Sequence, residues 1–339
     1  MKTILVTGGA GFIGSHTCVA LQEKGYNVLI ADNLSNSDQS VIERIEQITG
    51  IAPEFVKVDL SNPKECAMLF ATHPHIDGVI NFAAFKAVGE SCEKPLEYYH
   101  NNLGVLLNVL DNMCSYGVRY IVHSSSCTVY GQPEKLPITE NSPTQMAQCP
   151  YGNTKQMAED ILSFVVKAMD IKAIALRYFN PIGAHPSALI GESPRGVPNN
   201  LMPYITQTAA GLRDHLTVFG NDYPTPDGTC IRDYIHVVDL AQAHVVAMDR
   251  FFQGKTKIPL ECFNIGTGKG FSVLEVIKSF EKTSGKHLNY SFGPRRAGDI
   301  IQIWADTTLA EKELGWHSEL SLDEMTLCAW RWQEQLGKN

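Results

Sequence analysis

The sequence predicts an α/β fold in which a doubly wound parallel sheet is joined to a smaller C-terminal lobe. Short apolar runs rich in β-forming residues alternate with stretches of helical periodicity over about the first half of the chain. Such alternation makes the strands parallel and puts helices on both faces of one sheet. Beyond residue 180 proline and glycine become frequent, which indicates loops that cover a ligand.

The expected elements follow one another in a regular order. Strands are expected at 2–7, 26–32, 54–60, 77–84, 120–126 and 171–179. Helices are expected at 12–25, about 38–49, 62–73, 95–116 and 151–169, and later near 199–210, 239–252 and 272–284. Gly25 and Gly50 mark the ends of the first two helices. We expect a first domain over 1–180 and a mainly ligand-binding lobe over 181–339, from which runs such as 261–266 return to the main sheet.

The composition narrows the classes of function. The 339 residues carry a formal net charge of −8, which argues against unaided binding to nucleic acid or to an anionic membrane. The nine cysteines form no C-x-x-C pair, which favours reduced thiols and neither a zinc site nor a redox motif. The N-terminal apolar run is too short for a signal peptide or a membrane span. We therefore expect a cytoplasmic protein without a metal site, and we interpret His16, His123 and His236 as structural residues.

The glycine-rich stretch TGGAGFIG, residues 7–14, predicts a dinucleotide-binding turn. Gly8 and Gly11 allow a tight turn whose amides approach a pyrophosphate, and Gly14 lets the next helix pack closely on the strand. Asp32 follows Gly14 by 18 residues, where its carboxylate would bind a ribose diol and repel a 2′-phosphate. A purely structural turn with a helix-capping aspartate is the alternative. The strand, the helix and the spacing of the acid together favour a Rossmann-type domain that binds NAD.

The stretch YGNTK, residues 151–155, opens an expected helix with a tyrosine and a lysine on one face. Tyr151 and Lys155 lie four positions apart, so the phenol and the ammonium can be neighbours. Taken alone, the pair fits a surface tyrosine beside a solvated lysine. Ser126 ends the strand before this helix, at the sheet edge where ligands bind in such folds. With that hydroxyl added, the three residues form a candidate catalytic group.

These motifs together resemble the extended short-chain dehydrogenase/reductase family, and within it the UDP-hexose 4-epimerases. Blocks in the family order cover nearly the whole chain, among them NFAAFKAVGES (81–91), RYFNPIGAHPS (177–187) and RDYIHVVDLA (232–241). The resemblance implies an NAD-dependent isomerase that interconverts UDP-glucose and UDP-galactose through a 4-keto sugar. It implies that Tyr151 is the base, that Ser126 assists it and that Lys155 favours its phenolate.

The resemblance also implies two sets of binding residues. NAD contacts are implied for Gly8, Gly11, Phe12, Ile13, Gly14, Asp32, Asn33, Asp59, Leu60, Phe82, Ala83, Ala84, Lys86, Asn101, Ser126, Tyr151, Lys155 and Phe179. UDP-sugar contacts are implied for Ser126, Tyr151, Asn180, Asn200, Thr217, Val218, Phe219, Arg232, Arg296, Asp299 and Ile303. Arginines suit the diphosphate and an aromatic ring suits uracil, which makes the second set chemically sensible.

Two other functions are weighed against this one. An NDP-sugar 4,6-dehydratase shares the cofactor site, but that family places an Asp-Glu pair after the serine or threonine, where this chain has Cys127 and Thr128. A non-catalytic NAD-binding regulator would be expected to lose the tyrosine or the lysine, and this chain retains both. The residues therefore favour an epimerase over either alternative.

The resemblance carries two further expectations. Ile303 stands where epimerases restricted to glucose and galactose carry a tyrosine, so some activity on N-acetylated UDP-hexosamines is expected. The alternative is that Ile303 only packs against a neighbouring strand. The expected helix 95–116 is apolar on more than one face, and the resemblance implies that it and helix 151–169 pair with their copies in a twofold four-helix interface. We therefore expect a homodimer.

Overall fold

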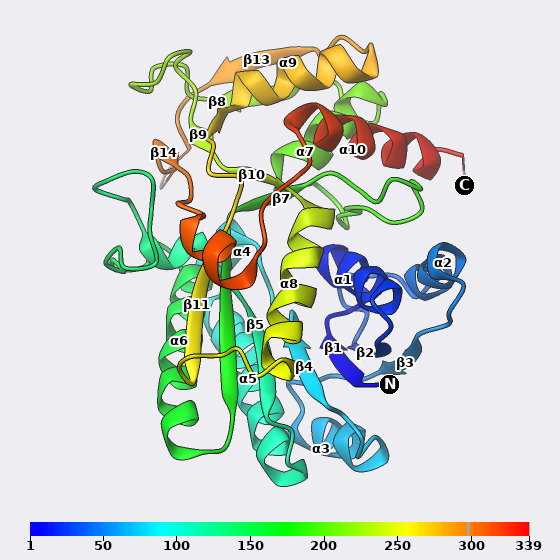
Figure 1. Ribbon diagram of the computed structural model, residues 1–339. Helices are drawn as coiled ribbons and strands as arrows, with labels where there is room; N and C mark the ends of the chain where they lie inside the picture. The colour runs from blue at the N-terminus through cyan, green and yellow to red at the C-terminus, as the bar shows by residue number, and fades with distance from the viewer. Residues whose placement is uncertain (297–298, 339) are drawn as a thin grey trace.

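A single parallel sheet of seven strands forms the centre of the computed structural model, which describes residues 1–296 and 299–338 (Figure 1). The strands are β1 (Thr3–Thr7), β2 (Asn27–Asp32), β3 (Glu54–Lys57), β4 (Gly78–Asn81), β5 (Tyr120–Ser126), β6 (Lys172–Tyr178) and β11 (Leu260–Ile265). Their order across the sheet is β11-β6-β5-β4-β1-β2-β3, and each neighbouring pair is parallel. The chain runs outward from β1 to β3 and then returns to β4 on the other side of β1. That reversal opens a crevice at the carboxyl ends of β1 and β4, where such sheets bind ligands.

Helices cover both faces of this sheet, as the sequence predicts. They are α1 (Phe12–Glu23), α2 (Ser40–Thr49), α3 (Pro63–Thr72), α4 (Val88–Glu93), α5 (Pro95–Tyr116), α6 (Pro150–Ala168) and α8 (Val237–Phe252). Ile4 and Val6 of β1 pack with α1, α2 and α8 on one face, while Leu5 packs with α3, α5 and α6 on the other. This alternation follows from the period of two along a strand, and it confirms the predicted doubly wound sheet.

A second lobe lies above the carboxyl edge of the sheet in the view of Figure 1. Its helices are α7 (Leu201–Ala209), α9 (Val273–Ser284) and α10 (Leu322–Leu336), and its strands are β8 (Leu216–Phe219), β9 (Ile231–Arg232), β12 (Phe271–Ser272), β13 (Tyr290–Gly293) and β14 (Gln302–Ile303). The parallel pair β7 (Asn180–Ile182) and β10 (Tyr234–His236) lies between the lobes. The second lobe has an apolar core of its own, which includes Ile205, Phe280 and Trp330.

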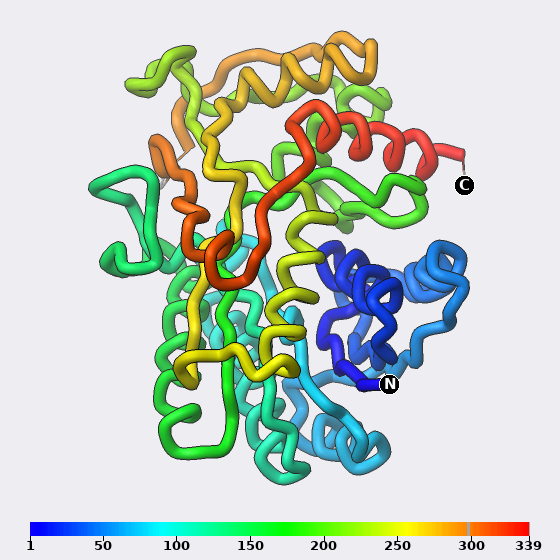
Figure 2. Tube along the Cα trace, in the orientation of Figure 1, coloured from blue at the N-terminus to red at the C-terminus, as the bar shows by residue number. Residues whose placement is uncertain are grey.

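The chain passes between the lobes more than once, which Figure 2 shows along the trace. Two elements from the second half of the chain, β11 and α8, belong to the first lobe. β11 pairs with β6 at one edge of the central sheet, and α8 packs against α1. No helix among residues 1–296 and 299–338 combines the length and the apolar character that crossing a bilayer needs.

Candidate active site

The turn after β1 has a backbone that only glycine fits at two positions. Gly8 has φ +69°, and a Cβ there would lie 2.9 Å from the amide nitrogen of Ala83. A Cβ on Gly14 would lie 2.3 Å from the carbonyl oxygen of Gly8, so a side chain there would push α1 away from the turn. Phe12 and Ile13 form the first turn of α1, whose free amides and dipole favour a phosphate. The cradle and helix therefore suit the pyrophosphate of a dinucleotide.

Asp32 lies beside this cradle at the end of β2. Its carboxylate accepts hydrogen bonds from the Ala10 amide at 3.1 Å, the Leu34 amide at 2.9 Å and the Ser37 hydroxyl at 2.9 Å. These contacts fix the carboxylate between the glycine turn and the next loop, where the predicted ribose contact requires it. A carboxylate beside a glycine cradle fits NAD, whose adenosine ribose carries a free diol.

The other predicted NAD residues follow the neighbouring strands. Ala83 donates its amide to the Thr7 hydroxyl at 3.2 Å, which holds the loop after β4 against the glycine turn. Asp59 caps the loop after β3 by accepting the Ser61 amide at 2.9 Å. Leu60 is buried in the apolar core. Around the same edge of the sheet, Phe179 is buried, Lys86 is exposed, and four residues are partly buried: Asn33, Phe82, Ala84 and Asn101.

Asn102, which the sequence reasoning missed, fixes the loop after β4. Its side-chain oxygen accepts the Phe85 amide at 2.8 Å, and its amide group donates to the Phe85 carbonyl at 3.0 Å and to the Thr154 hydroxyl at 3.1 Å. The neighbouring Asn101 donates to Asn102 at 2.9 Å. No sequence signal identifies Asn102, because its burial and its partners are seen only in the structure.

The structure brings Ser126, Tyr151 and Lys155 together in a buried site at the ends of β5 and α6. The Lys155 Nζ donates to the Ser124 carbonyl at 2.6 Å and lies 5.9 Å from the centre of the Tyr151 ring. Ser126 Oγ accepts the Thr128 amide at 3.2 Å and so begins the short 3₁₀ helix Cys127–Tyr130. The spacing of four residues on α6 therefore places phenol and ammonium side by side, as expected.

Burial acts on the two titratable groups in opposite directions. It raises the pKa of Tyr151 well above its usual value, while the neighbouring Ser126 side chain acts to lower it. It lowers the pKa of Lys155 to about 8, against the attraction of the Glu159 carboxylate. His123 lies near Lys155, and burial holds its pKa well below the usual range, so it stays neutral. Burial thus opposes ionisation of Tyr151, and the hydrogen bond with Ser126 acts in favour of its phenolate.

Glu159, two turns after Tyr151 on α6, ties this helix to the strand that carries Ser126. Its carboxylate accepts the Ser125 hydroxyl at 2.5 Å and the Arg177 Nη2 at 2.6 Å. Arg177 also donates to the Tyr130 hydroxyl at 2.9 Å. The network therefore links α6, β5, β6 and the 3₁₀ helix, which are the elements that position the three catalytic candidates.

The predicted diphosphate residues converge on one carboxylate in the second lobe. Asp299 Oδ1 lies 3.6 Å from Arg232 Nη2 and 2.9 Å from Arg296 Nη2. Phe219 is exposed at the end of β8, whereas the side chain of Val218 is buried in the core. Thr217 precedes them on the same strand, Asn180 begins β7, and Asn200 directly precedes α7. The structure thus brings the two arginines to one carboxylate, and arginines are the residues that suit a diphosphate.

Asp233, also missed from the sequence, fixes the segment after Ile303. It is fully buried and accepts the Thr267 amide at 2.8 Å, the Gly268 amide at 3.2 Å and the Ala305 amide at 3.1 Å. Burial raises the pKa of its carboxyl to about 6. The DY pair in RDYIHVVDLA offered no sign of this role, because all three partners lie more than thirty residues away.

Ile303 is 2% exposed and pairs with Arg232 between β14 and β9. It packs in a small apolar cluster with Val129, Tyr130 and Phe179, and Cys127 lies at the edge of that cluster. Its neighbours thus include the residue after Ser126 and one predicted NAD contact. Packing against strands and lining the sugar pocket are both compatible with this position, so its role as a gate stays a prediction.

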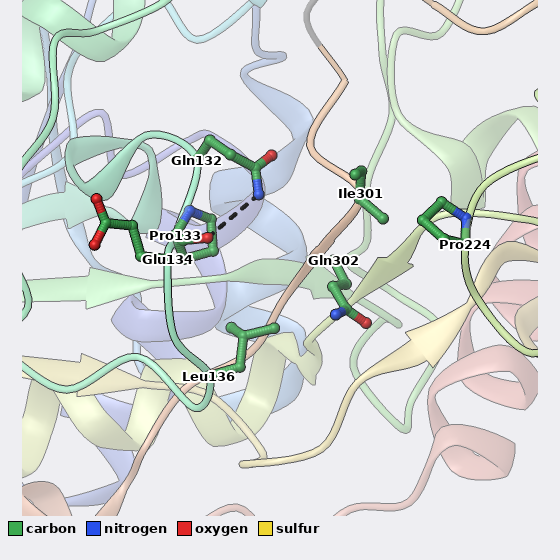
Figure 3. Close-up of a pocket in the computed structure, with 7 residues that line it drawn as sticks. All are labelled: Gln132, Pro133, Glu134, Leu136, Pro224, Ile301 and Gln302. Atoms are coloured by element: carbon green, nitrogen blue, oxygen red, sulfur yellow. Dashed lines mark hydrogen bonds between the residues drawn. The ribbon is translucent and has the colours of Figure 1, made fainter.

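A cavity of about 230 Å³ adjoins this region between the loop after the 3₁₀ helix and β14 (Figure 3). Its lining residues are Gln132, Pro133, Glu134, Leu136, Pro224, Ile301 and Gln302. None of them belongs to the predicted catalytic or binding sets, although Gln302 directly precedes Ile303. Within the described ranges 1–296 and 299–338, no cluster of three or more His, Cys, Asp or Glu side chains is placed to hold a metal ion.

Comparison with known proteins identifies the family. A family model described as GDP-mannose 4,6 dehydratase matches residues 5–327. A UDP-glucose 4-epimerase of Bacillus subtilis is 52% identical over 331 residues, which cover 97% of this chain and 96% of the relative. The chain belongs to the UDP-glucose 4-epimerase family. This membership, like the Cys127-Thr128 pair, disfavours the dehydratase alternative, even though the matching family model is named after a dehydratase.

Solved structures of this epimerase family share the whole fold. The enzyme from Stenotrophomonas maltophila, with bound NAD and formylated UDP-arabinopyranose, matches with a TM-score of 0.95 at 48% identity over 100% of this chain and 99% of that one. The enzyme from Bifidobacterium longum, in complex with NAD+ and UDP, matches with a TM-score of 0.94 at 48% identity over 98% of both chains. The predicted fold and family are therefore confirmed.

Proposed function

We propose that this protein interconverts UDP-glucose and UDP-galactose by inverting the hexose at C4, with NAD as its tightly bound cofactor. The observation that carries the proposal is the buried group of Ser126, Tyr151 and Lys155 at the same carboxyl edge of the sheet as the glycine turn, in a chain whose epimerase relatives are about half identical to it. The turn at Gly8 and Gly14 and the Asp32 carboxylate would hold NAD, which would supply the oxidant for C4 of the sugar and the hydride that reduces the other face of the ketone.

The roles of the catalytic residues follow from their positions. Tyr151 takes the proton of the 4-hydroxyl and later gives it back, so that no second acid is needed. Ser126, at the end of β5, holds the same hydroxyl and lowers the pKa of Tyr151. Lys155 supplies positive charge on the same helix face and is anchored by the Ser124 carbonyl. The buried setting strengthens each of these interactions, because water is excluded.

The binding residues divide the substrate into a fixed and a turning part. Arg232, Arg296 and Phe219 hold the UDP moiety from the second lobe, and Asn180 and Asn200 contribute amides. Asp299 orients both arginines. Inversion at C4 requires the hexose ring to turn, so that its 4-keto form presents its other face before the hydride returns. Anchoring by the remote UDP group is what keeps the turning sugar in place.

We also propose that the protein is a homodimer. α5 and α6 pack against one another and leave apolar side chains on their outer surface, among them Leu107, Met157 and Phe164. Phe164 is 71% exposed, and several exposed apolar side chains on two paired helices are typical of an interaction surface. A twofold copy of this surface would form a four-helix contact. Because all nine cysteines are unpaired, we further propose a cytoplasmic location.

Incubation of the purified protein with UDP-galactose, followed by separation of the products, tests the proposed reaction. UDP-glucose is expected to accumulate to a fixed ratio that is the same from either direction, without added NAD. Absorbance of reduced nicotinamide should appear in the protein during turnover. If neither sugar is converted while NAD remains bound, the chain is a binding protein and the proposal is wrong.

A further inference from the structure

The segment between β7 and α7, residues 183–200, extends between α10 and α1 in Figures 1 and 2. In the sheet β1 lies between β2 and β4, so the glycine turn lies between the loops that follow those two strands. Segment 183–200 contacts both of these loops. It therefore crosses the edge of the crevice in which the family binds NAD.

The first contact is made by Arg195 to the loop after β2. Its Nη1 donates to the Ser35 carbonyl at 3.0 Å, and its Nη2 donates to the Ser37 carbonyl at 2.5 Å. Ser37 in turn donates its hydroxyl to Asp32 at 2.9 Å. Arg195 thus secures the loop that holds the carboxylate expected on the cofactor ribose.

The second contact is made by Glu192 to the loop after β4. Its Oε1 accepts the Lys86 Nζ at 3.1 Å and the Asn200 Nδ2 at 2.7 Å, and the Glu192 side chain is only 10% exposed. Lys86 is a predicted NAD residue and Asn200 a predicted UDP-sugar residue. One partly buried carboxylate therefore joins both binding sets through charge-assisted hydrogen bonds.

Trp332 in the second lobe contacts the backbone of Glu192 and Gly191. Trp332 of α10 donates its indole N–H to the Glu192 carbonyl at 2.9 Å. Gly191 lies against the same ring, since a Cβ there would be 2.5 Å from it. The Arg44 guanidinium of α2 lies 5.4 Å from the ring centre, so Trp332 also contacts the first lobe. The segment is thus fixed at its base and at both sides.

We propose that Glu192 and Arg195 are positioning residues that retain NAD by fastening segment 183–200 across the cofactor crevice. The inference rests on the proposed function, in which the hydride taken from the sugar must return to the same sugar. Release of cofactor between those two transfers would leave an oxidised 4-keto sugar in the site. A fastened segment lowers the rate of release, because both contacts must open before the crevice does.

NAD release from the purified holoenzyme tests this. The protein is diluted into buffer without NAD, and the free NAD is measured against time with a coupled dehydrogenase. Glu192→Ala is expected to raise the rate of NAD dissociation by about tenfold, because it removes the charge-assisted hydrogen bonds to Lys86 and Asn200. Arg195→Ala is expected to raise it by about threefold, because its contacts are exposed, and Arg195→Lys should restore part of the loss. Activity lost on dilution should return when NAD is added.

Arg213→Ala is the matched control, because within residues 1–296 and 299–338 the polar contacts of Arg213 are with α7. Its Nε donates to the Gln207 side chain at 2.8 Å, and its guanidinium lies 4.8 Å from the centre of the Tyr204 ring. Its NAD dissociation rate should equal that of the wild type. Unchanged rates in both Glu192→Ala and Arg195→Ala would overturn the inference, and so would activity that added NAD does not restore. A wild-type protein that binds no NAD would overturn the proposed function itself.

Discussion

The Glu159 carboxylate and the Arg177 guanidinium form a buried ion pair. Arg177 Nε donates to Glu159 Oε1 at 2.9 Å, and Arg177 Nη2 donates to Glu159 Oε2 at 2.6 Å. The pair fastens the helix that carries Tyr151 and Lys155 to β6, and through the Ser125 hydroxyl to β5. Breaking one partner leaves a buried charge without compensation.

Glu159→Gln is therefore expected to lower the free energy of unfolding by about 3 to 5 kcal/mol. Urea denaturation followed by circular dichroism measures this. Asp170→Asn is the matched control, because the Arg119–Asp170 pair is exposed, and its effect should stay below about 1 kcal/mol. Equal effects of the two substitutions would show that burial does not distinguish the pairs.

Tyr151→Phe should abolish most of the epimerisation while the protein still binds NAD. The ring is kept and only the proton-transferring oxygen is lost, so the turnover number is expected to fall by about 10² to 10⁴. Product analysis gives the rate, and the NAD content of the purified variant gives the control. Activity within a few-fold of the wild type would exclude Tyr151 as the base.

Lys155 makes the stability of the fold depend on pH in a defined direction. Its pKa is about 8 in the folded protein and 10.5 ordinarily, so between these values the unfolded chain binds more protons. The free energy of unfolding contributed by this group therefore rises with pH from about 8 to 10.5, by at most about 1.4 kcal/mol per pH unit.

Lys155→Met removes the titrating ammonium group, so comparing this variant with the wild type isolates the contribution of Lys155. The difference in unfolding free energy between wild type and Lys155→Met should shift in favour of the wild type as pH rises through this window. Below pH 8 the difference should be constant. A difference that does not change up to pH 10.5 would mean that the folded pKa of Lys155 is close to its ordinary value.

The exposed apolar surface of α5 and α6 gives a prediction about assembly. Phe164→Glu places a charge in the proposed twofold contact and is expected to yield a monomer by light scattering at micromolar concentration. Leu212→Glu is the matched control, because Leu212 is 67% exposed but lies after α7 in the second lobe. A monomeric wild type would contradict the proposed homodimer.

The central sheet and the glycine turn could be predicted because their patterns are local. Strand runs such as 2–7 are apolar and bounded by glycines, and the spacing of Tyr151 and Lys155 sets a shared helix face. The strands of the second lobe were harder to recognise, since β9, β12 and β14 have two residues each and show no alternation. α10 was missed, although Ser321 and Glu324 form a capping box at its start.

The residues that support the site were missed for a different reason. Asn102, Glu159, Glu192 and Asp233 act through partners far away in the sequence, and no local pattern reports those contacts. Lys86 was predicted from the family motif, but its bond to Glu192 joins positions 106 residues apart. Such contacts follow from how the lobes pack, so they require the three-dimensional structure.

The last prediction concerns which sugars are accepted. Ile303 lies in an apolar cluster beside Cys127, the residue that follows Ser126. Isoleucine lacks the ring and hydroxyl of the tyrosine that the family resemblance implies for glucose-restricted epimerases, yet it is stiff at χ1 and cannot easily move aside. Pocket fit of this kind changes discrimination by about 1 to 3 kcal/mol. UDP-glucose and UDP-galactose should therefore be the better substrates, with measurable epimerisation of the N-acetylated UDP-hexosamines.

Ile303→Tyr should remove the N-acetyl activity selectively, as measured by kcat/KM for UDP-galactose and UDP-N-acetylgalactosamine in parallel. Ile301→Tyr is the matched control, because Ile301 lines the neighbouring cavity rather than the cluster around Ile303. Its ratio of the two activities should equal that of the wild type. Ile303 is 2% exposed, so the larger ring must displace its neighbours, and a thermal melt of each variant separates that cost from an effect on the sugar. If a folded Ile303→Tyr protein keeps both activities in their original ratio, Ile303 only packs against its strands and another residue closes the pocket.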